Sequence, residues 1–224
     1  MKTFRIVLTL AALLLPACGA AESQQTMNDQ LIAAAERGDT AALERLIRAG
    51  AQVDARDARG RTAAMAATHG RQPAALQALI AAGADLNIRD SRQDNPLLYA
   101  GAEGLIEILR LAIAAGADTR ITNRFGGTAL IPAAERGHVE VVRELLSTSD
   151  VNVNHVNNLG WTALLEAIVL SDGGSRHQQI VQLLVNHGAD LNLPDRDGVT
   201  PLAHARRSGF TAIAAILEGA GARP

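Results

Sequence analysis

Cys18 is the only cysteine among the 224 residues of the chain, and it lies near the N-terminus in the stretch LLLPACGA at positions 13 to 20. A lone thiol cannot close an intramolecular disulfide, and it supplies only one of the several ligands that a metal site needs. The chemistry left to it is covalent modification. We therefore expect Cys18 to be an attachment point.

The other residue types that could do chemistry are not spaced for it. The six histidines form no His-Glu-x-x-His or His-x-His motif, and no second cysteine could complete a zinc site. The chain has no Gly-x-Ser-x-Gly motif and no glycine-rich phosphate loop. The run from Asp195 to Gly198 is similar to the start of a calcium loop but lacks the remaining ligand spacing. The sequence therefore predicts no catalytic residues, no metal site and no cofactor.

The first 17 residues have the layout of a bacterial secretory signal peptide. Lys2 and Arg5 precede an apolar run at residues 6 to 15, and small residues follow. The stretch Leu15-Pro16-Ala17-Cys18 resembles the lipobox of bacterial lipoproteins, although Pro16 departs from the usual small or β-branched residue. The resemblance implies that a lipid is attached to Cys18. The alternative is ordinary cleavage that leaves a free periplasmic protein, after Gly19, Ala20 or Ala21.

Length and charge limit where the protein can work. The apolar run of ten residues is too short to span a bilayer, which takes about 20 residues. Removal of Lys2 and Arg5 leaves 19 basic residues against 23 acidic ones, a net charge of −4. A mildly acidic chain without a basic tract is poorly suited to nucleic acid. We expect the protein in the periplasm, or at the periplasm-facing membrane surface, of a Gram-negative bacterium.

The chain after residue 27 repeats itself. Polar markers that are each followed by a small apolar block recur at steps of 33, 33, 34 and 38 residues, namely Thr62, Asn95, Thr128, Thr162 and Thr200. Threonine and asparagine are good helix N-caps, so a short helix is predicted to begin at each marker. A second helix with apolar residues at helical spacing follows and ends at a glycine. Each unit is therefore predicted to be helix, turn, helix and a projecting β-turn finger.

These units resemble the repeats of ankyrin-repeat proteins, which are about 33 residues long and contain a Thr-Pro-Leu-His-x-Ala block. TPLAHA at residues 200 to 205 is the closest copy, and no copy has histidine at the fourth position. The family's inter-repeat histidine hydrogen bonds are therefore not expected from this block. The resemblance implies an all-α fold, an ankyrin-repeat solenoid of about six helix-turn-helix repeats with β-turn fingers.

Three parts of the chain are predicted: a signal peptide at residues 1–17, a lipid-attachment cysteine with a short polar tether at residues 18–27, and a monomeric ankyrin-repeat domain at residues 28–224. The repeats are placed at 28–57, 58–90, 91–123, 124–157, 158–195 and 196–224. An extended tether of nine residues reaches roughly 30 Å at most. The glycine and serine residues inserted at 171–175 predict a flexible loop.

Positions that vary between the repeats are candidates for recognition. The two middle fingers carry Phe125, Leu159 and Trp161 as candidate apolar anchors, because aromatic and arginine side chains contribute much of the energy of protein interfaces. Packing between neighbouring fingers is the alternative for the two aromatic residues, and Tyr99 is expected in the core. The charged candidates, for which a solvated face is the alternative, are Arg92, Asp94, Arg124, Glu135, Arg136 and Arg196.

The sequence and its resemblance together imply an exported, membrane-anchored module that binds an unidentified protein partner in the bacterial cell envelope, and not an enzyme. The membrane contact would come from the lipid on Cys18. The alternative is an immunity or inhibitor protein that blocks an envelope toxin or hydrolase.

Overall fold

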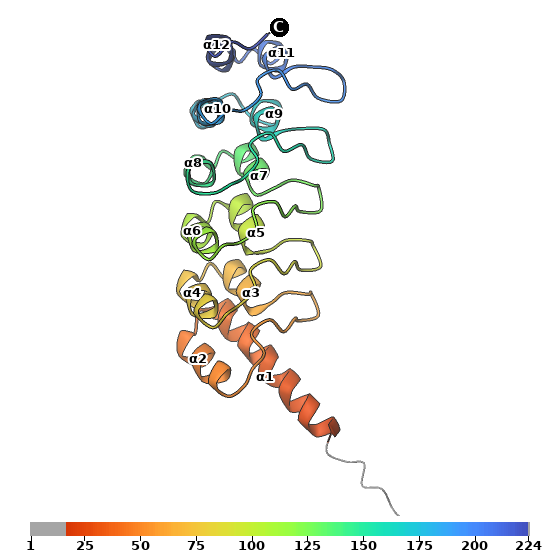
Figure 1. The fold of residues 1–224 in the computed structure, drawn as a ribbon, viewed down its shortest axis with the longest axis vertical. Helices are drawn as coiled ribbons and strands as arrows, with labels where there is room; N and C mark the ends of the chain where they lie inside the picture. Colours follow the sequence, from red (N-terminus) through yellow and green to blue (C-terminus); the bar gives the residue numbers. More distant parts are fainter. Residues whose placement is uncertain (1–16, 224) are drawn as a thin grey trace, which may run out of the picture.

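The computed structural model describes residues 17–223, and within them twelve helices are stacked as six pairs along one axis (Figure 1). The first helices of the pairs are α1 (Ala17–Arg37), α3 (Ala63–His69), α5 (Pro96–Glu103), α7 (Leu130–Glu135), α9 (Ala163–Val169) and α11 (Pro201–Arg207). The second helices are α2 (Thr40–Arg48), α4 (Pro73–Ala81), α6 (Ile106–Ala114), α8 (Val139–Thr148), α10 (Ser175–Asn186) and α12 (Thr211–Gly219). The predicted all-α solenoid is confirmed.

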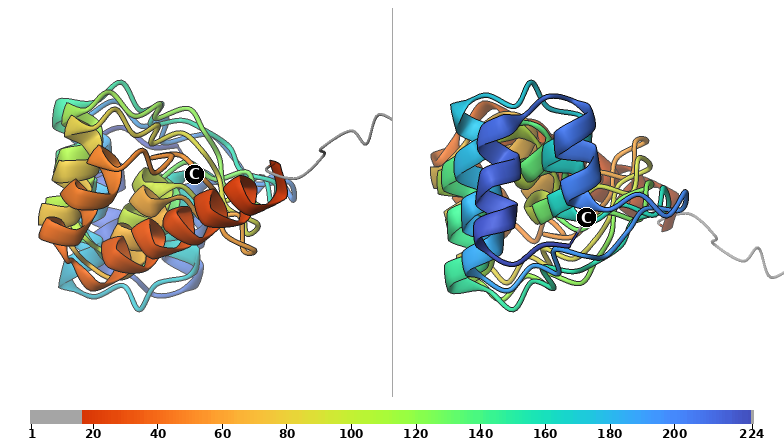
Figure 2. Two further views of the ribbon diagram at one scale, coloured as in Figure 1. Left: turned by 90° about the horizontal axis from the view of Figure 1, so that it is seen from below. Right: turned by 90° about the horizontal axis from the view of Figure 1, so that it is seen from above.

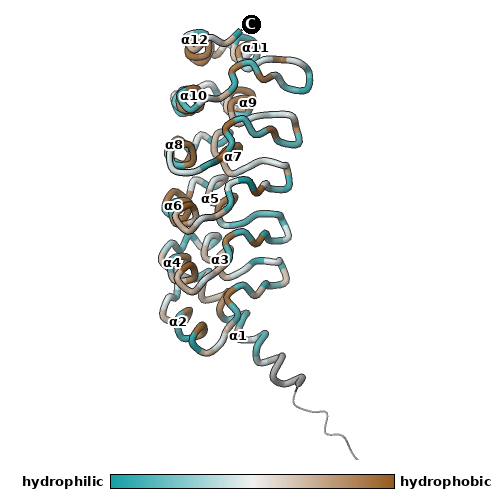
Figure 3. Tube along the Cα trace, in the orientation of Figure 1, coloured by the Kyte–Doolittle hydropathy of each residue, from teal (hydrophilic) through white to brown (hydrophobic). Residues whose placement is uncertain are grey.

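The first and second helices form two layers, and the fingers project on the side of the first helices (Figure 2). Apolar residues concentrate in the helices and polar residues along the fingers (Figure 3). Leucines and alanines of successive pairs form one continuous core, in which Ala66, Ala67, Leu76 and Leu79 are fully buried. Small alanine side chains let the first helices approach closely, and each pair buries its apolar faces only against its neighbours.

Four of the five predicted N-caps are confirmed. A side-chain oxygen of Thr62, Asn95, Thr162 or Thr200 accepts a hydrogen bond, 2.9 to 3.3 Å long, from the backbone N–H three residues later. The carbonyl of the same residue accepts the next N–H, as in the 3.0 Å bond between Glu166 N and Thr162 O.

Thr128 departs from this pattern because of Pro132. Proline has no N–H, so the Thr128 carbonyl accepts from Ile131 N instead, at 3.2 Å. That bond uses the Ile131 N–H group, which the Thr128 hydroxyl would otherwise have accepted as a helix cap. Thr128 Oγ1 is therefore buried without a hydrogen bond in the described part of the chain.

Histidines link adjacent repeats from a position other than the fourth residue of the block. His138 Nε2 lies 3.1 Å from the carbonyl oxygen of Ala102, and His177 Nε2 lies 3.0 Å from that of Glu135. Both histidines are near the start of a second helix, and each satisfies a carbonyl near the end of the preceding repeat's first helix.

The segment expected to be a tether is helical. Residues 18–27 belong to α1, whose first turns project away from the helix stack (Figure 1). Gln24 Nε2 donates to Gly50 O over 3.1 Å, so α1 contacts the first repeat before residue 28. At 1.5 Å per residue, ten helical residues extend only about 15 Å. The signal peptide predicted at residues 1–17 lies outside the described residues except for Ala17, and none of the helices at 17–223 is long and apolar enough to cross a membrane.

The insertion at 171–175 is held by hydrogen bonds rather than loosely arranged. Asp172 Oδ1 accepts from Gly174 N at 2.8 Å and lies 3.2 Å from His177 Nδ1. The Gly173 carbonyl accepts from Gln178 Nε2 at 2.8 Å. Polar side chains at the start of α10 therefore give the glycine-rich segment a defined path beside the end of α9.

Candidate functional site

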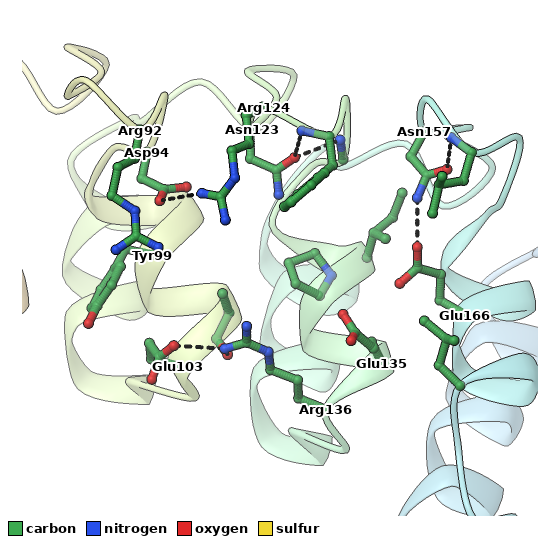
Figure 4. A pocket seen from close by; sticks show the side chains of 17 residues that line it. Arg92, Asp94, Tyr99, Glu103, Asn123, Arg124, Glu135, Arg136, Asn157 and Glu166 are labelled. Carbon is green, nitrogen blue, oxygen red and sulfur yellow. Dashed lines mark hydrogen bonds and ion pairs between the residues drawn. The ribbon is translucent and has the colours of Figure 1, made fainter.

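A hollow of about 250 Å³ lies where the fingers meet α5, α7 and α9 (Figure 4). The fingers contribute Asn123, Arg124, Phe125, Asn157 and Leu159 to its lining. The first helices contribute Tyr99, Glu103, Pro132, Glu135 and Glu166, among others. No residue of the second helices lines the hollow, so it lies on the finger side of the solenoid.

The fifth residue of three Thr or Asn blocks lines the hollow. Tyr99, Pro132 and Glu166 hold that position in three successive repeats, and all three line the hollow. The expectation that Tyr99 belongs to the core is wrong, because the neighbouring fourth residue, Leu98, is buried while Tyr99 is only half-buried. The Tyr99 ring instead packs on His69, with a centroid distance of 4.2 Å.

Two arginines in the hollow have carboxylate partners. Arg136 Nη1 lies 2.7 Å from Glu103 Oε1 and also donates to the Ala102 carbonyl. Arg124 Nη1 lies 3.9 Å from Asp94 Oδ2. Burial and the nearby Asp90 carboxylate raise the pKa of Asp94, and Arg124 opposes that rise.

Glu166 is the most deeply buried charged group of the hollow, with 4% of its surface exposed. Asn157 Nδ2 donates to Glu166 Oε1 over 2.6 Å. Burial, and then the neighbouring Glu135 carboxylate, raises the pKa of Glu166 to about 7, whereas the hydrogen bond from Asn157 lowers it. Within residues 17–223, Glu135 has no basic side chain within ion-pair distance.

Asn157 reaches Glu166 because the turn of its finger fixes the amide. Asn157 Oδ1 accepts the backbone N–H groups of Leu159 and Trp161, at 2.9 and 3.0 Å. This Asx turn uses the amide oxygen and leaves the amide nitrogen facing the hollow. The Asx-x-x-Gly sequence of the finger is therefore the local reason for the contact.

Three large apolar side chains at the hollow are exposed to solvent. Phe125 and Leu159 are each 53% exposed and Leu170 is 49% exposed, and all three line the hollow. The Arg124 guanidinium lies 4.5 Å from the centroid of the Phe125 ring, in a cation–π arrangement.

The hollow gathers seven of the residues predicted to contact a partner: Arg92, Asp94, Arg124, Phe125, Glu135, Arg136 and Leu159. Trp161 and Arg196 do not line it. Trp161 is partly buried at the base of its finger, and Arg196 donates to the carbonyl of Asn158 on the preceding finger. The role of all nine residues in binding a partner stays a prediction, as does the lipid on Cys18.

Sequence reasoning missed Tyr99, Asn157, Glu166 and Leu170 as parts of this site. The signal available for two of them was the fifth block position, which changes from repeat to repeat while the residues on both sides stay small or apolar. It reads Ala66, Tyr99, Pro132, Glu166 and His204.

The chain is similar to known proteins in both sequence and fold. A sequence profile described as ankyrin repeats in three copies matches residues 9–90, 31–123 and 97–195. The crystal structure of an ankyrin repeat domain from Acinetobacter baumannii AYE has 54% sequence identity and a TM-score of 0.84, over 86% of this chain and 98% of that one. The ankyrin repeat domain of Bcl-3, a member of the IkappaB protein family, has 25% identity and a TM-score of 0.79, over 87% of this chain and 86% of that one.

A curated relative matches a shorter stretch. The putative ankyrin repeat protein YahD of Escherichia coli strain K12 is 56% identical over 80 residues, which is 36% of this chain and 40% of YahD. The match therefore spans less than half the length of that relative.

Proposed function

We propose, from the premise that the chain belongs to the ankyrin-repeat family, that it is an exported module that holds a protein partner at the hollow on its finger side. The family is one of binding scaffolds, and we propose no catalytic activity for this member.

One observation carries the proposal: Phe125, Leu159 and Leu170 are about half exposed and surround the same hollow. Protein interfaces have an apolar centre within a polar rim, and aromatic and arginine residues often dominate their energy. Arg124, which lies over the Phe125 ring, and Arg136 line the same hollow. The hollow therefore has the composition of an interface centre.

The scaffold supports binding with little change of shape. The helices that line the hollow are packed on both sides by neighbouring repeats, and the finger turns are closed by Asx hydrogen bonds. Preorganised surfaces of this kind lose little conformational entropy on binding. We expect the backbone around the hollow to be nearly the same with and without the partner.

Export to the cell envelope and anchoring through Cys18 are also part of the proposal. They are supported by the basic start, the apolar run at residues 6 to 15 and the position of the lone cysteine. With a lipid on Cys18, α1 would act as a short arm between the membrane surface and the first repeat. Intact-mass measurement of the chain from membranes, compared with a Cys18→Ser variant, tests the anchor: a lipid-sized mass on the wild type alone is expected.

The partner is tested by crosslinked capture from envelope extract, with the full chain as bait. We compare wild type with Phe125→Ala/Leu159→Ala and with Val156→Ala, a matched control that is 45% exposed but does not line the hollow. The proposal expects a protein that wild type and control recover and the folded double variant loses. Equal recovery by all three baits would show that the hollow is not the binding site. A recovered toxin or hydrolase that loses activity when bound would make the module an inhibitor.

A further inference from the structure

The charges of the hollow are unevenly paired. Seven charged side chains line it: Arg92, Asp94, Glu103, Arg124, Glu135, Arg136 and Glu166. Two of its arginines face Asp94 and Glu103, as described above. The carboxylates of the fourth and fifth repeats, Glu135 and Glu166, have no cationic partner in the described part of the chain. The end of the hollow nearest α9 therefore carries unbalanced acidic groups.

Glu166 has an oxygen without a hydrogen bond. Its Oε1 accepts from Asn157, whereas no donor among residues 17–223 reaches its Oε2. Figure 4 shows this second oxygen turned into the hollow, on the side where Glu135 lies. A buried carboxylate is costly unless a proton or a cation compensates its charge. The repulsion between Glu135 and Glu166 adds to that cost, and a cation placed between them would remove it.

Apolar side chains stand beside this pair of carboxylates. Leu170 follows Glu166 by one helical turn, and Leu159 lies on the same finger as Asn157. We call the site formed by Glu135, Leu159, Glu166 and Leu170 the acidic notch. Lysine and arginine bury an alkyl stem along apolar surface while they keep a charged head group. The two leucines of the notch therefore suit the alkyl stem of such a side chain, and the two carboxylates suit its charged head group.

Size favours a single side chain over a whole small molecule. The entire hollow measures about 250 Å³, and the notch is only one end of it. Pockets for drug-sized ligands are usually about 300 to 1,000 Å³. A single partner side chain that enters from solvent needs less room than a whole ligand.

We propose that the acidic notch binds a lysine or arginine side chain of the partner protein, with the cationic group between Glu135 and Glu166 and the alkyl stem against Leu159 and Leu170. This inference rests on the proposed function and adds the chemistry of the partner to it. The basic residue enters the fifth-repeat end of the hollow, and Phe125 remains free to contact an apolar neighbour in the partner.

Peptide titration of the full chain tests the notch, with backbone 1H–15N spectra as the readout. The probes are acetyl-Gly-Lys-Gly-amide, its arginine counterpart, and versions with norleucine or glutamate at the centre. The lysine and arginine peptides are expected to shift the amide signals of Gly127 and Leu159 in a saturable way. Glu166→Gln should weaken this binding about tenfold, because a hydrogen-bonded charge is lost. Glu140→Gln, on the outer face of α8, is the matched control and should have no effect.

Four outcomes would overturn the proposal: equal binding of the norleucine peptide, preferred binding of the glutamate peptide, no saturable shift with any peptide, or tighter binding of free 1,4-diaminobutane than of the lysine peptide. The last would assign the notch to a small amine. The capture experiment with Phe125→Ala/Leu159→Ala uses no peptide. A partner that is captured through the hollow while the lysine peptide fails would therefore refute the notch and leave the proposed function standing.

Discussion

The amide of Asn157 donates a 2.6 Å hydrogen bond to the carboxyl group of Glu166, which joins the turn of a finger to α9, the first helix that follows it. Asp195 and His204 form a corresponding link between the next finger and α11, over 2.7 Å and with the same separation of nine residues. The chemistry of the link differs between the two repeats, whereas the neighbouring residues Leu164 and Leu165 belong to the buried core. The pairs Asn157–Glu166 and Asp195–His204 therefore give the finger side of each repeat its own polar chemistry, while the apolar core stays alike from repeat to repeat.

Glu166→Gln should stabilise the protein at neutral and alkaline pH. The folded chain raises the pKa of Glu166 from 4.5 to about 7, so the folded state binds this proton more tightly than the unfolded state does. Wild-type stability is then lost as pH rises from 4.5 to 7, whereas glutamine keeps an acceptor for Asn157 without ionising. The variant's gain in unfolding free energy should be near zero at about pH 4 and reach about 3 kcal/mol by about pH 8. Urea titrations measure it, and a gain independent of pH would contradict the raised pKa.

Asn157→Asp should destabilise the protein at about pH 8. The new carboxylate can still close the finger turn, as Asp195 does with Asp197 N and Val199 N, but it replaces the donor to Glu166 by a second acceptor. We expect a loss of about 2 kcal/mol, and a smaller one at about pH 5, where a protonated Glu166 can donate. Asn123→Asp is the control, because the Asn123 side chain accepts the backbone N–H groups of Phe125 and Gly127 and donates to no group among residues 17–223. A control as unstable as Asn157→Asp would attribute the effect to the turn.

The helical repeats could be predicted because their signals are local. The cap residues recur at a fixed period, and Gly104 closes α5 in the left-handed conformation, with φ of +70°. The helical character of residues 18–27 was also accessible, since alanine, glutamate and glutamine there are good helix formers and no proline follows Ala17 before α1 ends. The tether prediction rests on the polarity of these residues, whereas their helix propensity indicates the structure that they adopt.

The candidate site was only partly accessible to the same reasoning. Phe125 and Leu159 could be placed on one surface because they hold equal positions of successive repeats, three residues before Thr128 and Thr162. The environment of Glu166 could not, because its burial depends on how Leu159, Leu170 and Asn157 pack around it, and Leu170 borders the inserted segment. A periodic sequence pattern predicts which face of the solenoid a side chain lies on, but it does not predict how deeply that side chain is buried.

Thr128→Val should leave stability unchanged or raise it slightly, whereas Thr62→Val should lower it by about 1 kcal/mol. Both threonines are buried, but only the Thr62 hydroxyl caps its helix, through Met65 N at 3.3 Å. Valine at position 128 removes a buried hydroxyl that has no hydrogen bond. Chemical denaturation of the two variants measures the difference, and equal losses would show that the Thr128 hydroxyl does find a partner.

Gly101→Ala and Gly219→Ala should change stability in opposite directions. A β-carbon at Gly101 in α5 would lie 2.7 Å from the Ala129 carbonyl oxygen and 2.9 Å from Ala129 Cβ, so α5 would be pushed away from the next repeat. We expect a loss of about 1 to 3 kcal/mol. A β-carbon at Gly219 meets nothing within 4 Å, and alanine there should add about 0.5 kcal/mol. Melting temperatures report both, and a stable Gly101→Ala variant would mean that adjacent repeats can separate without cost.

The affinity of the acidic notch for the lysine peptide should rise with pH. The ionisable residues on the helices packed against α9 include Glu135 on α7, with Arg136 directly after it, His177 on α10 and His204 on α11. Among these, Glu135 raises the pKa of Glu166. Since Glu166 must give up its proton to face a cation, binding should strengthen about tenfold between about pH 6 and pH 8 and level off above its pKa of about 7. Glu166→Gln should remove this dependence, and His204→Gln should keep it, because His204 is bound to Asp195. A dependence that survives in Glu166→Gln and disappears in His204→Gln would assign the titration to the histidine.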